Sequence, residues 1–228
     1  LIEVRQFPAA SSNLTYLIRI DGEEFVVRRP PFGNTVKTAH DMRREFDVLS
    51  NLSAVYLPSP KPILFCEDTT VIGSEFYLME RRTGIVIRGG LSEKRVPDEP
   101  ADSTIERFET DRSFQTNVCN GFIENLAELH SPDPTRAGLD GFGKPETHNR
   151  RQVEGWSKRY FSAKTHEWPE LEKCIVWLNE TIPTEFRASI IHNDYKFDNV
   201  MLDPHDLTKI TAVLDWEMVT VGDPLMDL

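Results

Sequence analysis

The protein has 228 residues, of which 39% are apolar and 28% charged, so it can bury a core beneath an ordinarily charged surface. Acidic residues outnumber basic ones by 37 to 26, which gives a formal net charge of −11. Proteins that bind nucleic acid or anionic membranes need positive charge, so this balance argues against both kinds of partner. No apolar run approaches the roughly 20 residues that a membrane span needs.

The cysteines and the N-terminus bear on the cellular compartment. Cys66, Cys119 and Cys174 stand far apart, and none belongs to a CxxC or a Cys/His pair at zinc spacing. We therefore expect reduced, buried thiols. The first residues also lack the basic and apolar regions of a signal peptide. A cytoplasmic protein is predicted, and an opening Leu1 in place of Met is compatible with an upstream segment.

In chain order, the first part of the sequence predicts strands and one helix. Residues 14–20 and 24–28 are rich in β-branched and apolar residues, and Asp21-Gly22 between them is typical of a hairpin turn. Two more strands are predicted at 61–66 and 76–79. A helix is predicted between the second and third strands because apolar residues recur there at helical spacing, at Val36, Ala39, Met42, Phe46, Leu49 and Leu52.

After Arg82 the pattern becomes helical. Ser103 with Glu106 forms a capping box, which predicts the start of a helix. Gly121 lies inside this helix and weakens it. A Pro/Gly-rich loop is predicted from Ser131 to Arg150. The apolar positions that mark this helix and two later ones are Val118, Phe122, Leu126 and Leu129, then Val153, Trp156 and Tyr160, then Leu171, Cys174, Ile175 and Leu178.

Three short strands are predicted near the end, at 189–191, 200–202 and 210–214, around a polar loop. A β-rich part with one helix thus precedes a helix-rich part that holds a small β-hairpin. This order predicts an α+β fold with two lobes, 1–82 and 83–228.

The polar loop between these strands contains the residues most suited to chemistry. His192, Asp194, Lys196 and Asn199 follow the spacing H-x-D-x-K-x-x-N, and Asp215 ends the next strand. A lone H-x-D arises often by chance, and a His-Asp pair or an Asp after a strand is often a turn residue. The conjunction of the loop, its two strands, the Asn and the second Asp favours a functional site.

This set of side chains suits phosphoryl transfer, which needs a metal on the triphosphate, a carboxylate facing the attacking hydroxyl and cations on the phosphates. Mg²⁺ prefers hard oxygen ligands, so Asn199 and Asp215 are the predicted metal ligands. Asp194 is the predicted proton acceptor, and Lys196 the predicted cation for the γ-phosphate. His192 is expected to brace the loop through hydrogen bonds.

The same stretch resembles the protein-kinase-like fold, and specifically the aminoglycoside phosphotransferase and choline kinase family. The catalytic loop of that family reads H-x-D-x-x-x-x-N, and its metal-binding Asp is followed by Trp, as Trp216 follows Asp215 here. The tail 222–228 resembles the family's G-D-P-x-x-D-L segment. Segments 12–17, 27–31 and 76–81 resemble a bacterial branch that is similar to the kinase-like domain fused to certain animal acyl-CoA dehydrogenases.

The likeness covers nearly the whole chain. It implies a small β-rich N-lobe with one helix and a larger, mostly helical C-lobe with a catalytic β-hairpin. ATP and Mg²⁺ are the implied cofactors.

The resemblance also implies roles in the first lobe. Residues 7–17 match a phosphate-covering turn in which Ser12 and Asn13 would meet phosphates, although an ordinary hairpin turn is the alternative. Ala9 and Ala10 stand where the branch has glycines, which weakens that phosphate contact.

Arg28 matches the strand cation that binds the α- and β-phosphates, since alternation puts it on the same face as Val26. Two solvated arginines, Arg28 and Arg29, on an edge strand are the alternative. Glu45 borders the apolar face of the predicted helix, where a charge needs a partner, and Arg28 is the expected one.

Two further pairs are assigned by likeness. Glu80 and Arg81 resemble the hinge that presents backbone groups to adenine. Asp223 and Asp227 resemble residues that tie down the catalytic loop. Trp216 is expected to pack rather than to react, and no role follows from the sequence for Asp198 or Glu217.

The sequence as a whole predicts an ATP- and Mg²⁺-dependent phosphotransferase acting on a hydroxyl of a small molecule. The nearest branch implies a hydroxyacyl acceptor, whereas the charge of −11 suits a cation such as an aminoglycoside or choline. A nucleotide-binding module without turnover is a second reading. A metal-dependent hydrolase built on His192 and Asp194 is a third, but it lacks further ligands at suitable spacing.

The sequence stops at Leu228, directly after the family-like tail, and the resemblance implies further helices beyond it. Without them, apolar surface should be exposed on the second lobe. The oligomeric state does not follow from the sequence.

Overall fold

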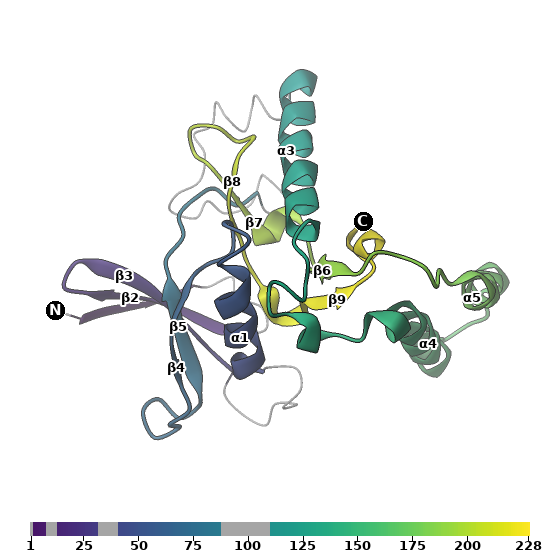
Figure 1. The fold of residues 1–228 in the computed structure, drawn as a ribbon, viewed down its shortest axis with the longest axis horizontal. Helices are drawn as coiled ribbons and strands as arrows, with labels where there is room; N and C mark the ends of the chain where they lie inside the picture. Colours follow the sequence, from purple (N-terminus) through teal and green to yellow (C-terminus); the bar gives the residue numbers. More distant parts are fainter. Residues whose placement is uncertain (1, 8–12, 32–40, 88–109) are drawn as a thin grey trace.

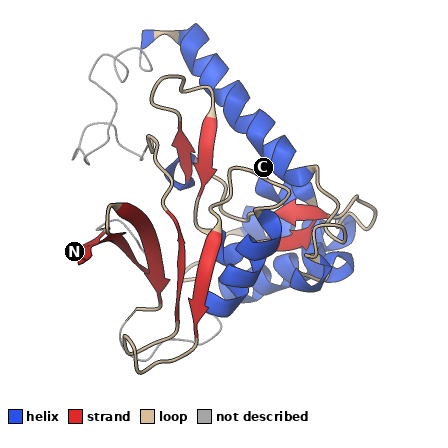
Figure 2. Ribbon diagram, turned by 60° about the vertical axis from the view of Figure 1, so that its left-hand side comes forward, coloured by secondary structure: helices blue, strands red, loops and turns tan. Residues whose placement is uncertain are grey.

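The computed structural model describes residues 2–7, 13–31, 41–87 and 110–228. A β-rich N-terminal part leads into a helical C-terminal part (Figure 1), as the sequence predicts. The strands of the N-terminal sheet gather on one side and the long helices on the other (Figure 2). The predicted division of the chain at residues 82 and 83 stays a prediction.

The N-terminal sheet is antiparallel, with strand order β1-β2-β3-β5-β4. Its strands are Ile2–Gln6 (β1), Leu14–Ile20 (β2), Glu23–Arg29 (β3), Pro62–Cys66 (β4) and Phe76–Glu80 (β5). The predicted hairpin is confirmed, because Asp21 (φ 51°) and Gly22 (φ 95°) make the turn between β2 and β3. Two successive positive φ values match the right-handed twist of the paired strands.

The helix of the N-terminal part is α1 (Met42–Leu52), which packs against β4 and β5. Asp41 caps it by accepting a hydrogen bond from the Arg44 N–H (2.9 Å). Its buried face includes Met42, Leu49 and Leu52, as predicted. The predicted positions Val36 and Ala39 lie outside the described residues.

The long helices of the C-terminal part are α3 (Arg112–His130), α4 (Pro145–Ala163) and α5 (Pro169–Thr181). Asp111 caps α3 by accepting from the Phe114 N–H (3.0 Å), whereas the predicted capping box lies outside the described residues. The loop expected to run to Arg150 ends earlier, because Pro145 stands in the first turn of α4, where a missing N–H is no loss.

Two small antiparallel sheets frame the polar loop. One pairs Ser189–Ile191 (β6) with Thr220–Gly222 (β9), and the other pairs Val200–Leu202 (β7) with Ile210–Val213 (β8). β9 was not predicted, because Thr220-Val221-Gly222 has one large apolar residue and no strand pattern of its own; it is a strand through its pairing with β6. Short 3₁₀ turns lie at Asp140–Phe142 (η1), Phe197–Asn199 (η2), Trp216–Met218 (η3) and Pro224–Asp227 (η4). A bridge between Ile85 and Leu202 joins the segment after β5 to β7.

Buried apolar side chains form one cluster that extends from the N-terminal sheet to the short strands of the C-terminal part. Its members include Val26, Leu49, Tyr77, Leu126, Ile190, Val200, Val213 and Trp216. This shared core fixes β6, β7 and β8, and with them the loop that they frame. Among the described residues, no helix is long and apolar enough to cross a membrane.

The three thiols are free, as expected, but two are not buried. Cys119 and Cys174 are exposed, and Cys66 is half-buried. Cys119 lies on α3 outside the buried face of that helix. Cys174 lies on α5, and the helical spacing that suggested a core position for it belongs to a helix with no buried residue.

Replacing Gly121 of α3 by Ala is expected to destabilise the fold. An added Cβ would lie 2.0 Å from the carbonyl oxygen of Thr208, and neither backbone can move easily. The clash should outweigh the gain in helix propensity and lower the free energy of unfolding by about 1–3 kcal/mol. Gly155 of α4 has no heavy atom within 4 Å of such a Cβ, so Gly155→Ala should instead stabilise by roughly 0.5–1 kcal/mol. Urea unfolding of both variants checks this, and a stabilised Gly121→Ala would contradict the packing of α3.

Candidate active site

The loop from His192 to Asn199, called here the 192–199 loop, leaves β6 and enters β7 through η2. Asp227 ties down its start: the His192 N–H donates to Oδ2 (2.8 Å) and the Asn193 N–H to Oδ1 (2.6 Å). The expected role of Asp227 is thus confirmed. Asp223 instead accepts from the Asn149 Nδ2 of α4 (3.0 Å) and caps η4, so it holds α4 rather than the loop.

His192 braces the loop from inside. The Asp194 N–H donates to Nδ1 (3.2 Å), and Nε2 lies 2.9 Å from the Leu214 carbonyl oxygen. Nδ1 therefore accepts, and Nε2 carries the proton and donates. Burial lowers the pKa of this imidazole, which favours the neutral ring. Both ring nitrogens are occupied by the backbone, so His192 is not available as a base.

Three of the predicted residues meet at the Asp194 carboxylate. Lys196 Nζ lies 2.8 Å from Oδ1, and Asn199 Nδ2 donates to Oδ2 (2.8 Å) and to the Asp194 backbone oxygen (3.0 Å). The hydrogen bond to Asp194 raises the pKa of the Lys196 ammonium. Both side chains are partly exposed, at 32% for Asp194 and 51% for Lys196. The carboxylate is thus oriented from two sides and still open to a substrate.

Asp215 lies beside this group. It follows β8 in the left-handed conformation (φ 66°), which for a non-glycine residue is a strained arrangement common at functional sites. The Leu214 N–H donates to the Asn199 carbonyl oxygen (2.8 Å), so the two predicted metal ligands occupy adjacent backbone positions.

Arg28 of β3 connects Asp215 to α1. One guanidinium nitrogen, Nη1, lies 3.2 Å from Glu45 Oε1, and the other, Nη2, lies 3.1 Å from Asp215 Oδ1 and 3.9 Å from Glu217 Oε2. The predicted contact of Arg28 with Glu45 is therefore present, and Arg28 is buried rather than solvated.

Burial governs the electrostatics of this pair. It raises the pKa of the Glu45 carboxyl, and Arg28 opposes that rise. For Arg28, burial alone would lower the pKa, but the surrounding Glu45, Tyr77 and Asp215 hold it above its usual value. The guanidinium is therefore a permanent cation, placed beside the carboxylates of Glu45, Asp215 and Glu217, and in this form it can bind phosphate oxygens.

Of the two turn residues expected at the phosphates, the structure describes Asn13. Ser12 lies outside the described residues, as do Ala9 and Ala10. Asn13 is only 2% exposed, and its Nδ2 donates to Glu217 Oε2 (3.0 Å). Its side chain is thus directed to a carboxylate of η3. The same contact places Glu217, which the sequence left without a role, inside the cluster around Arg28.

Glu80 and Arg81 make their contacts within the N-terminal sheet. The Glu80 carboxylate accepts from the Lys61 N–H (2.7 Å), and the Glu80 N–H donates to the Lys61 carbonyl oxygen (2.9 Å). Arg81 pairs with Glu24 of β3. The Glu80 N–H is therefore used at β4, and a hinge role for these two residues stays a prediction.

Arg44 of α1 is a site-supporting residue that the sequence did not indicate. Its guanidinium donates to the carbonyl oxygens of Val219 (2.5 Å), Glu217 (3.3 Å) and Phe142 (3.4 Å). It therefore fixes the segment after Asp215 against α1. The spacing did not mark it, because Arg44 is outside the set of buried residues of α1, and charged side chains outside such a face are ordinarily solvated.

The residues at Asp215 fit a magnesium ion. Asp215 offers a carboxylate, and Asn199, whose Nδ2 is used by Asp194, offers its amide oxygen. Mg²⁺ takes hard oxygen ligands, commonly one or two carboxylates with substrate phosphates. Among the described residues there is no cluster of three or more His, Cys, Asp or Glu with metal-binding geometry, so a metal held by protein alone is not indicated.

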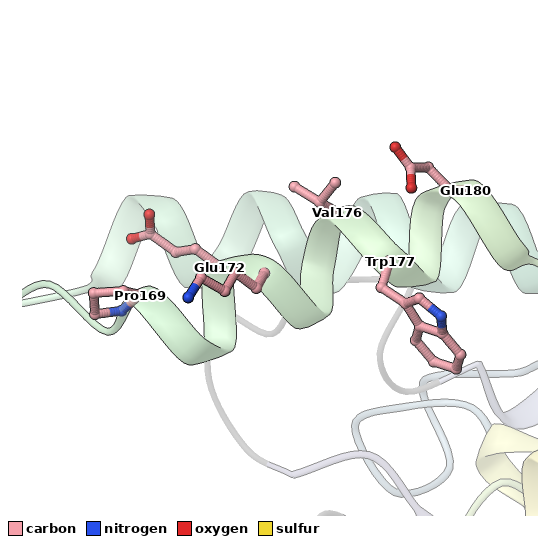
Figure 3. Close-up of a pocket in the computed structure, with 6 residues that line it drawn as sticks. Pro169, Glu172, Val176, Trp177 and Glu180 are labelled. Atoms are coloured by element: carbon pink, nitrogen blue, oxygen red, sulfur yellow. The ribbon is translucent and has the colours of Figure 1, made fainter.

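A hollow of about 460 Å³ lies elsewhere, on the surface of α5 (Figure 3). Its lining comes from that helix alone and includes none of the predicted site residues: Pro169, Glu172, Lys173, Val176, Trp177 and Glu180. Exposed apolar side chains, as expected on the second lobe, are found on and next to α4 and α5, where Trp156, Trp168 and Trp177 are all more than half exposed.

The neutral state of His192 gives a testable pH dependence. Its pKa is lowered by burial, so below the ordinary value of about 6.5 the unfolded chain binds a proton that the folded chain does not. The free energy of unfolding should therefore fall as the pH drops below about 6.5. Each buried imidazole can contribute at most about 1.4 kcal/mol per pH unit to this fall. His148, whose pKa burial also lowers, should add in the same direction.

Urea unfolding of wild type and His192→Gln between about pH 7.5 and pH 5.5 measures this dependence. The slope should be smaller in His192→Gln, and His148→Gln should remove a separate part of it. An unchanged slope in His192→Gln would show that this imidazole titrates normally.

Comparison with known proteins supports a family assignment. The model of the phosphotransferase enzyme family (APH) matches residues 3–228. Acyl-CoA dehydrogenase family member 10 of Mus musculus is 34% identical over 227 residues, which cover 100% of this chain and 20% of the mouse protein. A crystal structure from Ralstonia eutropha, described as an aminoglycoside phosphotransferase, is 31% identical with a TM-score of 0.78; the match covers 99% of this chain and 61% of that one.

A thermostable aminoglycoside phosphotransferase APH(4)-Ia, crystallised with ADP and hygromycin B, shares the fold at 14% identity and a TM-score of 0.65, over 99% of this chain and 70% of its own. The chain thus spans a fifth of the mouse relative and about three-fifths of the Ralstonia protein. Across nearly its whole length, the chain belongs to the phosphotransferase enzyme family.

Proposed function

We propose that this protein transfers the γ-phosphoryl group of ATP to a hydroxyl of a small molecule. The observation that carries the proposal is the convergence at one place of Asp194, Lys196 and Asn199 with Asp215 and its partner Arg28. A partly exposed carboxylate, two cations and two oxygen ligands are the groups that phosphoryl transfer requires. The related APH(4)-Ia structure, which contains ADP, supports a nucleotide as the donor.

Each residue has a stated role in this proposal. Asp194 accepts the proton of the acceptor hydroxyl while the oxygen of that hydroxyl attacks the γ-phosphorus. The bond from the γ-phosphorus to the β,γ-bridging oxygen breaks, and ADP is released. Lys196 neutralises charge on the γ-phosphate, and Arg28 on the α- and β-phosphates. Asn199 and Asp215 would hold Mg²⁺ through their side-chain oxygens. When bound, that ion neutralises charge on the phosphate oxygens.

The acceptor is proposed from the relatives. The match to an acyl-CoA dehydrogenase family member favours a hydroxyacyl compound, as a free acid or a CoA thioester. The APH(4)-Ia complex and the net charge of −11 favour an aminoglycoside or another cationic alcohol. The hydroxyacyl compound ranks first, because identity over the whole chain is more specific than bulk charge.

An ADP-release assay with Mg-ATP and a panel of acceptors tests the proposal. The panel contains hydroxyacyl-CoA thioesters, the free hydroxy acids, choline and an aminoglycoside. Release that depends on one acceptor is the expected result. Calorimetric binding of Mg-ATP without release on any acceptor would favour the nucleotide-binding module, and failure to bind Mg-ATP would overturn the nucleotide site.

A further inference from the structure

A buried amide behind the 192–199 loop receives two tyrosine hydroxyls. Asn125 of α3 is 6% exposed, and its Oδ1 lies 2.5 Å from the Tyr56 hydroxyl and 3.0 Å from the Tyr195 hydroxyl. An amide oxygen has two lone pairs, so both are used. Burial raises the pKa of both tyrosines, so each hydroxyl keeps its proton and remains a donor.

One of these tyrosines belongs to the loop itself. Tyr195 lies between Asp194 and Lys196, and its hydroxyl is also 3.0 Å from the Phe122 carbonyl oxygen of α3. Its ring packs on the Phe122 ring with centroids 4.5 Å apart. The loop is therefore held on α3 at the residue directly after the candidate base.

The other tyrosine, Tyr56, contacts the residue that follows Asp215. The Tyr56 ring meets Trp216 edge-on, with centroids 6.0 Å apart, and Trp216 directly follows Asp215. His192 also contacts Trp216, at 4.8 Å between centroids. A continuous path thus runs from Asp194 through Tyr195, Asn125 and Tyr56 to the residue beside Asp215.

We propose that Asn125 is a positioning residue for phosphoryl transfer. It fixes the distance between the 192–199 loop, which carries Asp194, and the segment Asp215-Trp216. This inference rests on the function proposed above. Misplacement of a reacting group by about 1 Å can lower a rate by 10²-fold, so a contact that sets two such groups against one another acts on turnover. Asn125 needs no contact with substrate to do this.

Replacing Asn125 by Leu removes the shared acceptor and keeps the bulk. The expected result is a fall in kcat of about 10- to 100-fold with the KM for ATP unchanged, because the ion pairs of Arg28 are with Glu45, Asp215 and Glu217 and not with Asn125 or its two tyrosines. Asn125→Asp keeps an oxygen acceptor and should retain more of kcat than Asn125→Leu. Asn149 of α4 is a matched control: it is also buried and hydrogen-bonded, to Asp223, so Asn149→Leu should lose stability but keep kcat.

Tyr56→Phe and Tyr195→Phe each remove one hydroxyl oxygen from the path. They test the inference even if Asn125→Leu does not fold. Each should lower kcat, and their effects should be non-additive in the double variant because the two hydroxyls share one acceptor. Wild-type kcat in Asn125→Leu would overturn this inference and leave the proposed function standing. If Asn125→Leu does not fold, wild-type kcat in both Tyr→Phe variants would have the same meaning. No ADP release by wild type on any acceptor would overturn the proposed function and this inference with it.

Discussion

Asp194→Asn should abolish turnover while nucleotide affinity stays close to that of the wild type. The amide keeps the size of the carboxylate and its place beside Lys196 and Asn199, but it no longer accepts a proton from the acceptor hydroxyl. General-base catalysis contributes about 10²–10⁴-fold, so kcat should fall by at least about 100-fold. Steady-state ADP release measures kcat, and calorimetry measures Mg-ATP affinity.

The matched control for this variant is Asp203→Asn. Asp203 follows β7 directly and accepts from the His205 N–H (2.7 Å) in the turn toward β8, outside the Asp194 cluster. It loses the same charge a few residues away, and kcat should stay at the wild-type level. Full activity of Asp194→Asn would remove Asp194 from the mechanism.

Arg28→Met should have the largest effect on stability. It leaves Glu45, 1% exposed, without its cation, and breaking a buried ion pair from one side destabilises by about 3–5 kcal/mol. Replacing both members by apolar residues of similar size removes the buried unpaired charge at position 45, and the other two carboxylates beside Arg28, those of Asp215 and Glu217, are partly exposed. Arg28→Met/Glu45→Leu should therefore recover most of the free energy of unfolding, which urea denaturation measures.

Nucleotide affinity should not recover with stability. The double variant still lacks the phosphate cation, and hydrogen bonds to charged groups contribute about 1.5–3 kcal/mol, or roughly 10- to 150-fold in affinity. Arg29→Met is the control, because Arg29 is also buried but donates to the carbonyl oxygens of Ile72 and Pro30. It should lose stability and keep Mg-ATP affinity. Wild-type affinity in Arg28→Met/Glu45→Leu would exclude Arg28 from the nucleotide site.

The parts of the site that were predictable are set by local patterns. The dipeptide Asp21-Gly22 predicts a hairpin turn by its residue types alone, and strand alternation puts Arg28 on the inner face of β3. The border position of Glu45 on an amphipathic helix required a buried cation, and Arg28 is that cation. The H-x-D-x-K-x-x-N spacing likewise fits one tight loop, so Asp194, Lys196 and Asn199 meet.

The remaining features depend on contacts between distant segments, which spacing does not encode. Asn13 meets Glu217 across 204 positions, and Arg44 reaches backbone oxygens of η3 from α1. β9 exists because Ser189–Ile191 supplies a partner for three residues with little pattern of their own. Gly121 looked like a weak point in a helix, yet its missing Cβ lets α3 lie against the Thr208 backbone.

Phosphoryl transfer by this protein is tested most directly by ³¹P nuclear magnetic resonance of a reaction mixture with Mg-ATP and the acceptor that supports ADP release. We expect a new phosphomonoester resonance on the acceptor, growing in step with ADP and absent in Asp194→Asn. Growth of inorganic phosphate alone, with no phosphorylated acceptor, would show hydrolysis rather than transfer and would contradict the central claim.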